Sequence, residues 1–153
     1  MTLYAVLKFL HIMSVLTWIG GVATLSMITG RLIKAGDRAA AAALFPHALA
    51  YGQRVAGPSS IVVLLTGIPM VMLGKIGFGA FWVSWGFAGM LLHFILGATM
   101  MRGRSTRFAQ LVADPSADDA RIAEAGARLR IANLIYVLIM VSVIGAMVLK
   151  PVL

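Results

Sequence analysis

With 153 residues, of which 61% are hydrophobic and only 12% charged, the chain has too few polar residues to cover a soluble domain of its size. Its formal net charge of +8 does not indicate nucleic-acid binding, because the basic residues lie between apolar runs instead of along one solvated face. The absence of cysteine excludes disulfides, thioether-attached haem and cysteine-ligated metal clusters. The composition therefore predicts a protein embedded in membrane lipid.

Four apolar runs are each long enough to cross the hydrocarbon core of a bilayer as a helix, which takes about 20 residues. These runs cover residues 3–29, 55–74, 78–101 and 131–149. The alternation of a β-barrel strand is absent, and a helix pairs all its backbone groups within itself in lipid. We therefore expect one all-α membrane domain over residues 1–153, a four-transmembrane-helix bundle.

The charges of the connections predict how the bundle is oriented. The connection between the second and third runs carries only Lys75. The other two connections are strongly basic, with Arg31, Lys34, Arg38, Arg54, Arg102, Arg104, Arg107, Arg121, Arg128 and Arg130. Because basic loops stay in the cytoplasm, we expect both of these connections to be cytoplasmic and both termini to lie outside.

Both basic connections are expected to be partly helical. In the first, an alanine-rich helix over 39–44 is predicted to end near Pro46. In the second, Ser116 is predicted to cap a helix, with Asp119 at the other position of the capping box. Neither glycine nor proline separates Arg128 from Asn133, so we expect this helix to continue into the fourth span.

Polar residues at membrane depth are costly and are usually functional or paired. No Asp or Glu lies in a predicted span, which argues against proton-coupled transport and hydrolysis. Two histidines remain, His11 in the first run and His93 in the third, and their depths differ by roughly 5 Å along parallel helices. A haem iron accepts axial histidine, so we predict that these two imidazoles flank one metal.

The neighbours of both histidines suggest a large flat ligand. Gly89 and Gly97 lie one turn before and one turn after His93, which either clears space for a porphyrin or lets two helices pack closely. On the face of His11, Lys8 is expected to reach a haem propionate or to extend to the headgroups. Trp18 is expected to pack on the macrocycle or to fill the core.

Two other functions stay open at this point. The ten methionines allow a copper-handling protein that uses His11, His93 and thioether sulfur, which favours Cu(I). Alternatively, the two histidines only form hydrogen bonds between helices, in a cofactor-free assembly subunit.

The sequence also resembles a known family at three of its runs. Its N-terminal part is similar to the motif Y-x2-L-K-x2-H-x6-W-x-G of the HemJ-type protoporphyrinogen oxidases of bacterial membranes, through Tyr4, Leu7, Lys8, His11, Trp18 and Gly20. Its last part resembles the R-x2-N and terminal K-P of that family, through Arg130, Asn133, Lys150 and Pro151. Trp82 and His93 fit the third span more loosely.

This resemblance implies a protein of the bacterial inner membrane that carries haem b, with His11 as an axial ligand. The superfamily also includes CopD-type copper-resistance proteins and uncharacterised predicted integral membrane proteins. Residues 22–26 read VATLS where the oxidases have Leu-Pro-Arg-Leu-Phe, and Gly86 replaces a lysine, so the haem scaffold carries over better than the oxidase activity.

The resemblance thus implies membrane electron transfer or haem-linked redox chemistry in the uncharacterised branch. Besides lipid, a redox partner or a quinone- or porphyrin-like molecule is the expected partner. Enzymatic activity and homodimerisation are left open.

Overall fold

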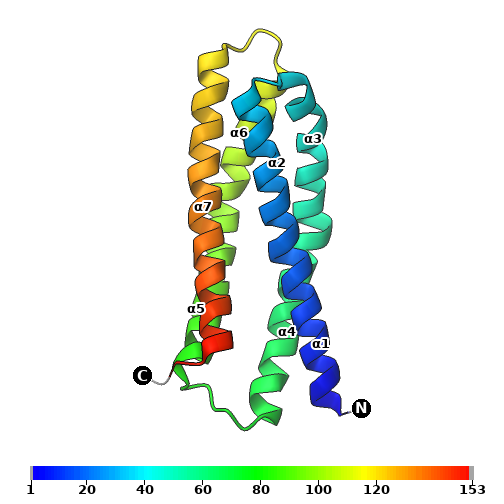
Figure 1. The fold of residues 1–153 in the computed structure, drawn as a ribbon, viewed down its shortest axis with the longest axis vertical. Helices are drawn as coiled ribbons and strands as arrows, with labels where there is room; N and C mark the ends of the chain where they lie inside the picture. The colour runs from blue at the N-terminus through cyan, green and yellow to red at the C-terminus, as the bar shows by residue number, and fades with distance from the viewer. Residues whose placement is uncertain (1, 152–153) are drawn as a thin grey trace.

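The computed structural model describes residues 2–151, and this part of the chain forms four long helical runs (Figure 1). Each of the first three runs consists of two α-helices joined by a five-residue π-helical segment, whereas the fourth is one α-helix. In chain order the elements are α1 (Leu3–Val15), η1 (Leu16–Gly20), α2 (Gly21–Ala35), α3 (Arg38–Tyr51), η2 (Gly52–Ala56), α4 (Gly57–Leu73), α5 (Phe81–Leu96), η3 (Gly97–Met101), α6 (Arg102–Ala113) and α7 (Asp119–Leu149).

Each predicted span corresponds to one of these four runs, which are long and apolar enough to cross a membrane, although the second span ends one residue earlier, at Leu73, and the third begins three residues later, at Phe81. Large apolar side chains point outward from every run, for example Leu3, Leu65, Leu91 and Leu138. A water-soluble bundle would not expose so many of them, whereas lipid covers them without cost. The prediction of an all-α membrane bundle with four spans is confirmed.

The helix ends differ in two places from the sequence-based expectations. α3 continues past Pro46 to Tyr51, because Phe45 is buried in the core and holds this turn in place. α7 is capped by Asp118, whose carboxylate accepts a hydrogen bond from the Ala120 N–H, and not by Ser116. The Ser116 hydroxyl instead donates to Asp114 at 2.7 Å. As predicted, α7 continues without a break into the fourth span.

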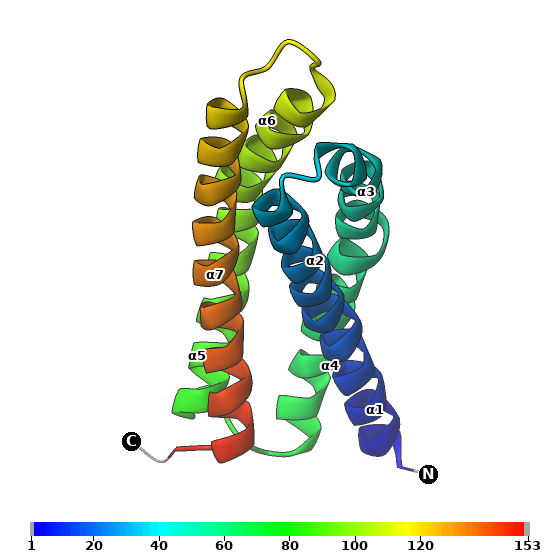
Figure 2. The same ribbon diagram turned by 45° about the horizontal axis from the view of Figure 1, so that its top comes forward.

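The two ends of the bundle are built differently. Both termini and the α4–α5 connection lie at one end, here called the terminal end, and the α2–α3 and α6–α7 connections lie at the other, the loop end (Figures 1 and 2). At the terminal end, α1 packs on α4 and α5 packs on α7. Within the described residues these two helix pairs make few close backbone contacts with each other.

At the loop end, α3, α6 and α7 share a core like that of a soluble bundle. The Phe108 side chain is fully buried there, and its ring centroid lies 5.0 Å from that of Phe45. A second core cluster lies halfway along the bundle and contains Trp18, Ala56, Val63, Met90, Tyr136 and Met140. The helices are therefore joined at the middle and at the loop end.

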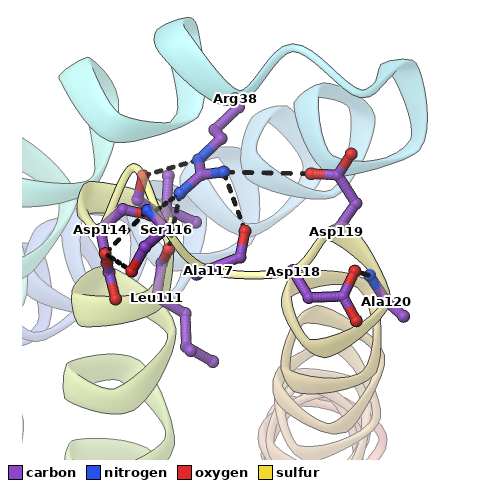
Figure 3. Close-up of polar contacts among 9 residues, drawn as sticks. Arg38, Leu111, Asp114, Ser116, Ala117, Asp118, Asp119 and Ala120 are labelled. Carbon is purple, nitrogen blue, oxygen red and sulfur yellow. Dashed lines mark hydrogen bonds and ion pairs between the residues drawn. The ribbon is translucent and has the colours of Figure 1, made fainter.

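Arg38, the first residue of α3, connects the two loop-end hairpins (Figure 3). Its guanidinium donates at 3.1–3.2 Å to three carbonyl oxygens and also contacts that of Asp114; the four acceptors are Leu111, Val112, Asp114 and Ala117. A cation at this place satisfies the last carbonyls of α6 and complements its dipole. The Asp119 carboxylate, 4.0 Å away and almost fully exposed, adds little.

Candidate functional site

The three π-helical segments lie together where the loop end meets the terminal end, and all three line one cavity. η1 contributes Trp18, η2 contributes Gln53 and η3 contributes Gly97 to the wall. A π-helical turn widens the helix and frees a backbone carbonyl, and such turns occur frequently at functional sites. The coincidence of three of them around one cavity marks this level as the candidate site.

One carbonyl of η1, that of Thr17, accepts a hydrogen bond from the Gly21 N–H and has a second partner from the next helical run. The Tyr51 hydroxyl donates a hydrogen bond to the Thr17 carbonyl oxygen in η1. The Tyr51 ring reaches it only because residue 21 is glycine: a Cβ atom on Gly21 would lie 1.9 Å from the Tyr51 hydroxyl oxygen. The adjacent Gly20 has no atom near the corresponding position. Of the two adjacent glycines, the fold therefore requires Gly21 and leaves space for a side chain at Gly20.

The cavity has a volume of about 740 Å³, within the range typical of cofactor and ligand sites. It extends from the middle of the bundle toward the loop end. Its wall is made by Trp18, Val22, Leu25, Ser26, Thr29, Phe45, Ala48, Leu49, Tyr51, Gly52, Gln53, Ala56, Gly57, His93, Gly97, Met101, Arg102, Ser105, Thr106, Leu129, Asn133 and Tyr136. None of these described residues carries a carboxylate, and Arg102 carries the permanent positive charge, so the wall favours neutral or anionic ligands.

His93 stands in this wall and is held by two aromatic residues. The Trp18 ring centroid lies 4.2 Å from that of the imidazole in an edge-on arrangement, and the Tyr136 ring centroid lies at 4.9 Å. The Trp18 indole donates a 3.1 Å hydrogen bond to the Tyr136 hydroxyl, and that hydroxyl contacts His93 Nδ1.

The Tyr136 hydroxyl can accept from both Trp18 and His93 while donating its own hydrogen into the cavity. Both ring nitrogens lie near this hydroxyl, Nδ1 in contact with it and Nε2 at 3.4 Å, and in the tautomer with the proton on Nδ1 it is Nε2 that has the free lone pair.

His11 lies in a different environment, between α1 and α4. Its Nδ1 is 3.0 Å from the Thr66 hydroxyl, which donates its own hydrogen to the Val62 carbonyl at 2.6 Å. Thr66 therefore accepts from His11, whose Nδ1 carries the proton. The ring lies against Gly67 of α4, where a Cβ atom would be in ordinary van der Waals contact with the imidazole at 3.4 Å. This histidine has a complete structural role within one helix pair.

Within the described residues, no hydrogen bond or ring contact joins His11 to His93, and only His93 lines the cavity. His11 lies seven residues before Trp18 on one helical run, about 10 Å along the axis. The structure thus brings Trp18 to His93 but does not bring the two histidines together. Lys8 is exposed and is not part of the cavity wall.

The two glycines that flank His93 in the sequence have different environments. A Cβ atom on Gly89 would lie 2.2 Å from a methyl group of Val143, so this glycine lets α5 pack closely against α7. Gly97 has no atom near its Cβ position and lines the cavity. The glycine at position 89 is thus explained by helix packing, whereas the glycine at position 97 leaves open space in the cavity wall.

Several residues of the cavity wall and of the His11 environment could not be assigned to these places from the sequence. Thr66 lies in the second predicted span and Gln53 just before it, but the sequence does not show which helix lies opposite either residue. Arg102 was counted as a topology charge, although its side chain lines the cavity. Tyr136 and Asn133 lie in the fourth predicted span, but the sequence does not show that Tyr136 bonds to Trp18 or that both residues line the cavity.

No curated protein and no solved structure matches the chain. One family does match, over residues 5–151, and its description is Predicted integral membrane protein (DUF2269). Because this match covers nearly the whole chain, including all four helical runs and the cavity, the protein belongs to the DUF2269 family of integral membrane proteins.

Proposed function

We propose that this protein binds one haem b in the cavity, with His93 as the axial ligand, and acts in membrane electron transfer or haem-linked redox chemistry. The observation that carries the proposal is the imidazole of His93 in the wall of a cavity of about 740 Å³, with its Nδ1 held by Tyr136. Metal-bound histidines have this arrangement, in which the second ring nitrogen is fixed by a partner from the surrounding shell.

The rest of the wall fits the chemistry of a porphyrin. Gly97, one turn after His93, leaves the space beside the imidazole free. Toward the loop end, the Arg102 guanidinium and the hydroxyls of Ser105 and Thr106 suit two propionates, which prefer cationic and hydroxyl donors. The apolar side chains of Val22, Leu25 and others would cover the ring and exclude water. The resemblance to haem-carrying HemJ-type proteins supports the same cofactor, but the axial ligand that it implies is His11, whereas the cavity favours His93.

In this proposal the cofactor supplies a one-electron couple, and the chain sets its environment. Tyr136 fixes the orientation of the His93 ring, and Trp18 packs edge-on against it. Changes in these hydrogen bonds alter the basicity of an axial ligand and so the reduction potential. His11 is not a ligand here, because it does not line the cavity. The proposal therefore uses one of the two histidines that the sequence suggested.

The proposed location is the bacterial inner membrane, with the loop end in the cytoplasm and both termini outside. Basic residues of α2, α3, α6 and α7 near the loop end, among them Arg31, Lys34, Arg38 and Arg107, support this orientation, since the α4–α5 connection contains only one basic residue, Lys75. Arg102 and the propionate end of the cavity would then lie near the cytoplasmic surface.

The test is an absorption spectrum of the protein purified in detergent, before and after dithionite. The wild type should show a Soret band that shifts on reduction, His93→Ala should lose it, and His11→Ala should keep it. Helicity by circular dichroism controls for folding of both variants. A Soret band lost in His11→Ala but kept in His93→Ala would assign the axial ligand to His11 instead of His93. Colourless protein from haem-replete cells would overturn the proposal, and copper without iron in metal analysis would replace it with copper handling.

A further inference from the structure

A second, smaller hollow of about 470 Å³ lies between α4 and α5, next to the main cavity. It is here called the side groove. Four of its residues, Gln53, Gly57, His93 and Gly97, also line the main cavity. The remaining ones are Pro58, Ser60, Ile61, Phe94 and Ala98. The side groove and the cavity thus share one wall, which contains the imidazole.

The position of the side groove shows how an occupant reaches it. Ile61 on α4 and Phe94 on α5 are 51% and 40% exposed, and both belong to the apolar surface that faces lipid. An occupant therefore enters from within the bilayer and must itself be lipid-soluble.

The chemistry of the lining narrows the class of occupant. None of the described lining residues carries a permanent charge, so a phosphate or carboxylate group would find no counter-ion. Near the shared wall, the Gln53 amide offers hydrogen-bond donors. The Ser60 hydroxyl is fully buried and donates to the Gly57 carbonyl at 2.6 Å, so it offers no donor to a ligand. Neutral polar groups at the shared wall and apolar groups toward lipid suit a neutral head with a hydrocarbon tail.

We propose that the side groove binds a membrane quinone. A carbonyl oxygen of its ring accepts a hydrogen bond from the Gln53 amide, the ring lies against the wall shared with the cavity, and the isoprenoid tail leaves past Ile61, Phe94 and Ala98 into the bilayer. The binding is argued from the groove alone, whereas a role for the quinone as the redox partner of the haem rests on the function proposed above.

Photoaffinity labelling tests this binding in lipid nanodiscs. An azido derivative of a short-tailed ubiquinone is photolysed with the protein, and the labelled peptides are mapped by mass spectrometry. Adducts are expected within residues 53–61 and 94–98, and excess unmodified short-tailed ubiquinone should suppress them. Label spread over all lipid-facing helices, or label that phosphatidylglycerol suppresses equally well, would overturn the proposal.

Two neighbouring substitutions provide a matched pair. Ala98→Phe places a ring in the groove and should weaken labelling at least about tenfold, which corresponds to about 1.4 kcal/mol of binding free energy. Thr99→Phe adds a ring at the next position, which is exposed but lines neither hollow, and should leave labelling unchanged. Equal loss in both variants would contradict the groove as the site.

The haem spectrum, recorded on the same samples, separates the two proposals. Groove labelling in a protein without a Soret band would contradict the haem proposal and support the quinone site. A Soret band without groove labelling would support the haem proposal and contradict the quinone site. Haemin that suppresses the label in protein lacking a Soret band would show a porphyrin in the groove and would overturn the quinone proposal.

Discussion

The loop end and the terminal end of this bundle are held together by different kinds of interaction. At the loop end, α3, α6 and α7 bury Phe45 and Phe108 against each other, and Arg38 ties the two hairpins together. At the terminal end, two helix pairs, α1–α4 and α5–α7, hardly approach each other. The first region is packed like a soluble protein, whereas the second relies on lipid to cover apolar side chains.

The candidate site lies at the boundary between these two regions. Its wall uses the three π-helical segments, each of which interrupts a run as it passes from the terminal end to the loop end. A binding site is most precise when rigid elements support it. The loop end supplies that support, and the separation of the helix pairs beyond the boundary leaves the side groove accessible from lipid. Three substitutions, one at the loop end, one at the boundary and one at the terminal end, test this comparison.

The largest effect is expected at the loop end, from Arg38→Ala. This change removes one cation that donates to four carbonyl oxygens, and we expect a loss of about 3 kcal/mol in the free energy of unfolding, measured by denaturant titration in detergent. Arg31→Ala removes an exposed cation at the same end and should change stability by less than about 0.5 kcal/mol. Equal losses in the two variants would show that Arg38 does not join the hairpins.

A smaller effect is expected at the boundary, from Gly21→Ala. The new methyl group must displace the Tyr51 ring and break its bond to the Thr17 carbonyl, at a cost of about 2 kcal/mol in thermal or denaturant unfolding. Gly20→Ala is the matched control, because nothing lies near its Cβ position and alanine favours the helix. A Gly21→Ala protein as stable as the control would contradict the close approach of Tyr51 to η1.

The smallest effect is expected at the terminal end, from Thr66→Val. Valine keeps the shape of threonine but leaves His11 Nδ1 without its partner, which should cost about 1 kcal/mol of stability. Thr99→Val removes a hydroxyl that bonds only to the Ile95 carbonyl of its own helical run, and it should change stability by less than about 0.5 kcal/mol. If Thr66→Val instead abolishes a Soret band, His11 holds the haem and its hydrogen bond positions an axial ligand.

The sequence was sufficient to predict the spans because their signal is local. A run of about 20 apolar residues must become a helix in lipid whatever its neighbours are, and an uninterrupted α7 follows from the lack of glycine and proline between Arg128 and Asn133. The Glu124–Arg128 pair, at 2.6 Å, follows from helical spacing alone. The end of α3 and the cap of α7 were misjudged, because tertiary packing at Phe45 and a competing turn at Asp114 decided them.

The candidate site was only partly visible in the sequence. His93 and Gly97 stood out as a polar residue and a small residue within a span, and both line the cavity. That Gly89 faces Val143, that His11 pairs with Thr66, and that Arg102 reaches the cavity all depend on how each helix is rotated. In lipid, apolar residues cover every side of a helix, so hydropathy carries little information about that rotation.

The sequence by itself therefore determined that this chain crosses a membrane four times as helices, through the length and composition of its apolar runs. The tertiary structure decided where a ligand is held, because the π-helical turns, the separation of the two histidines and the shared wall at His93 arise from contacts between helices far apart in the chain. Such contacts depend on helix rotation and depth, which local sequence patterns do not specify.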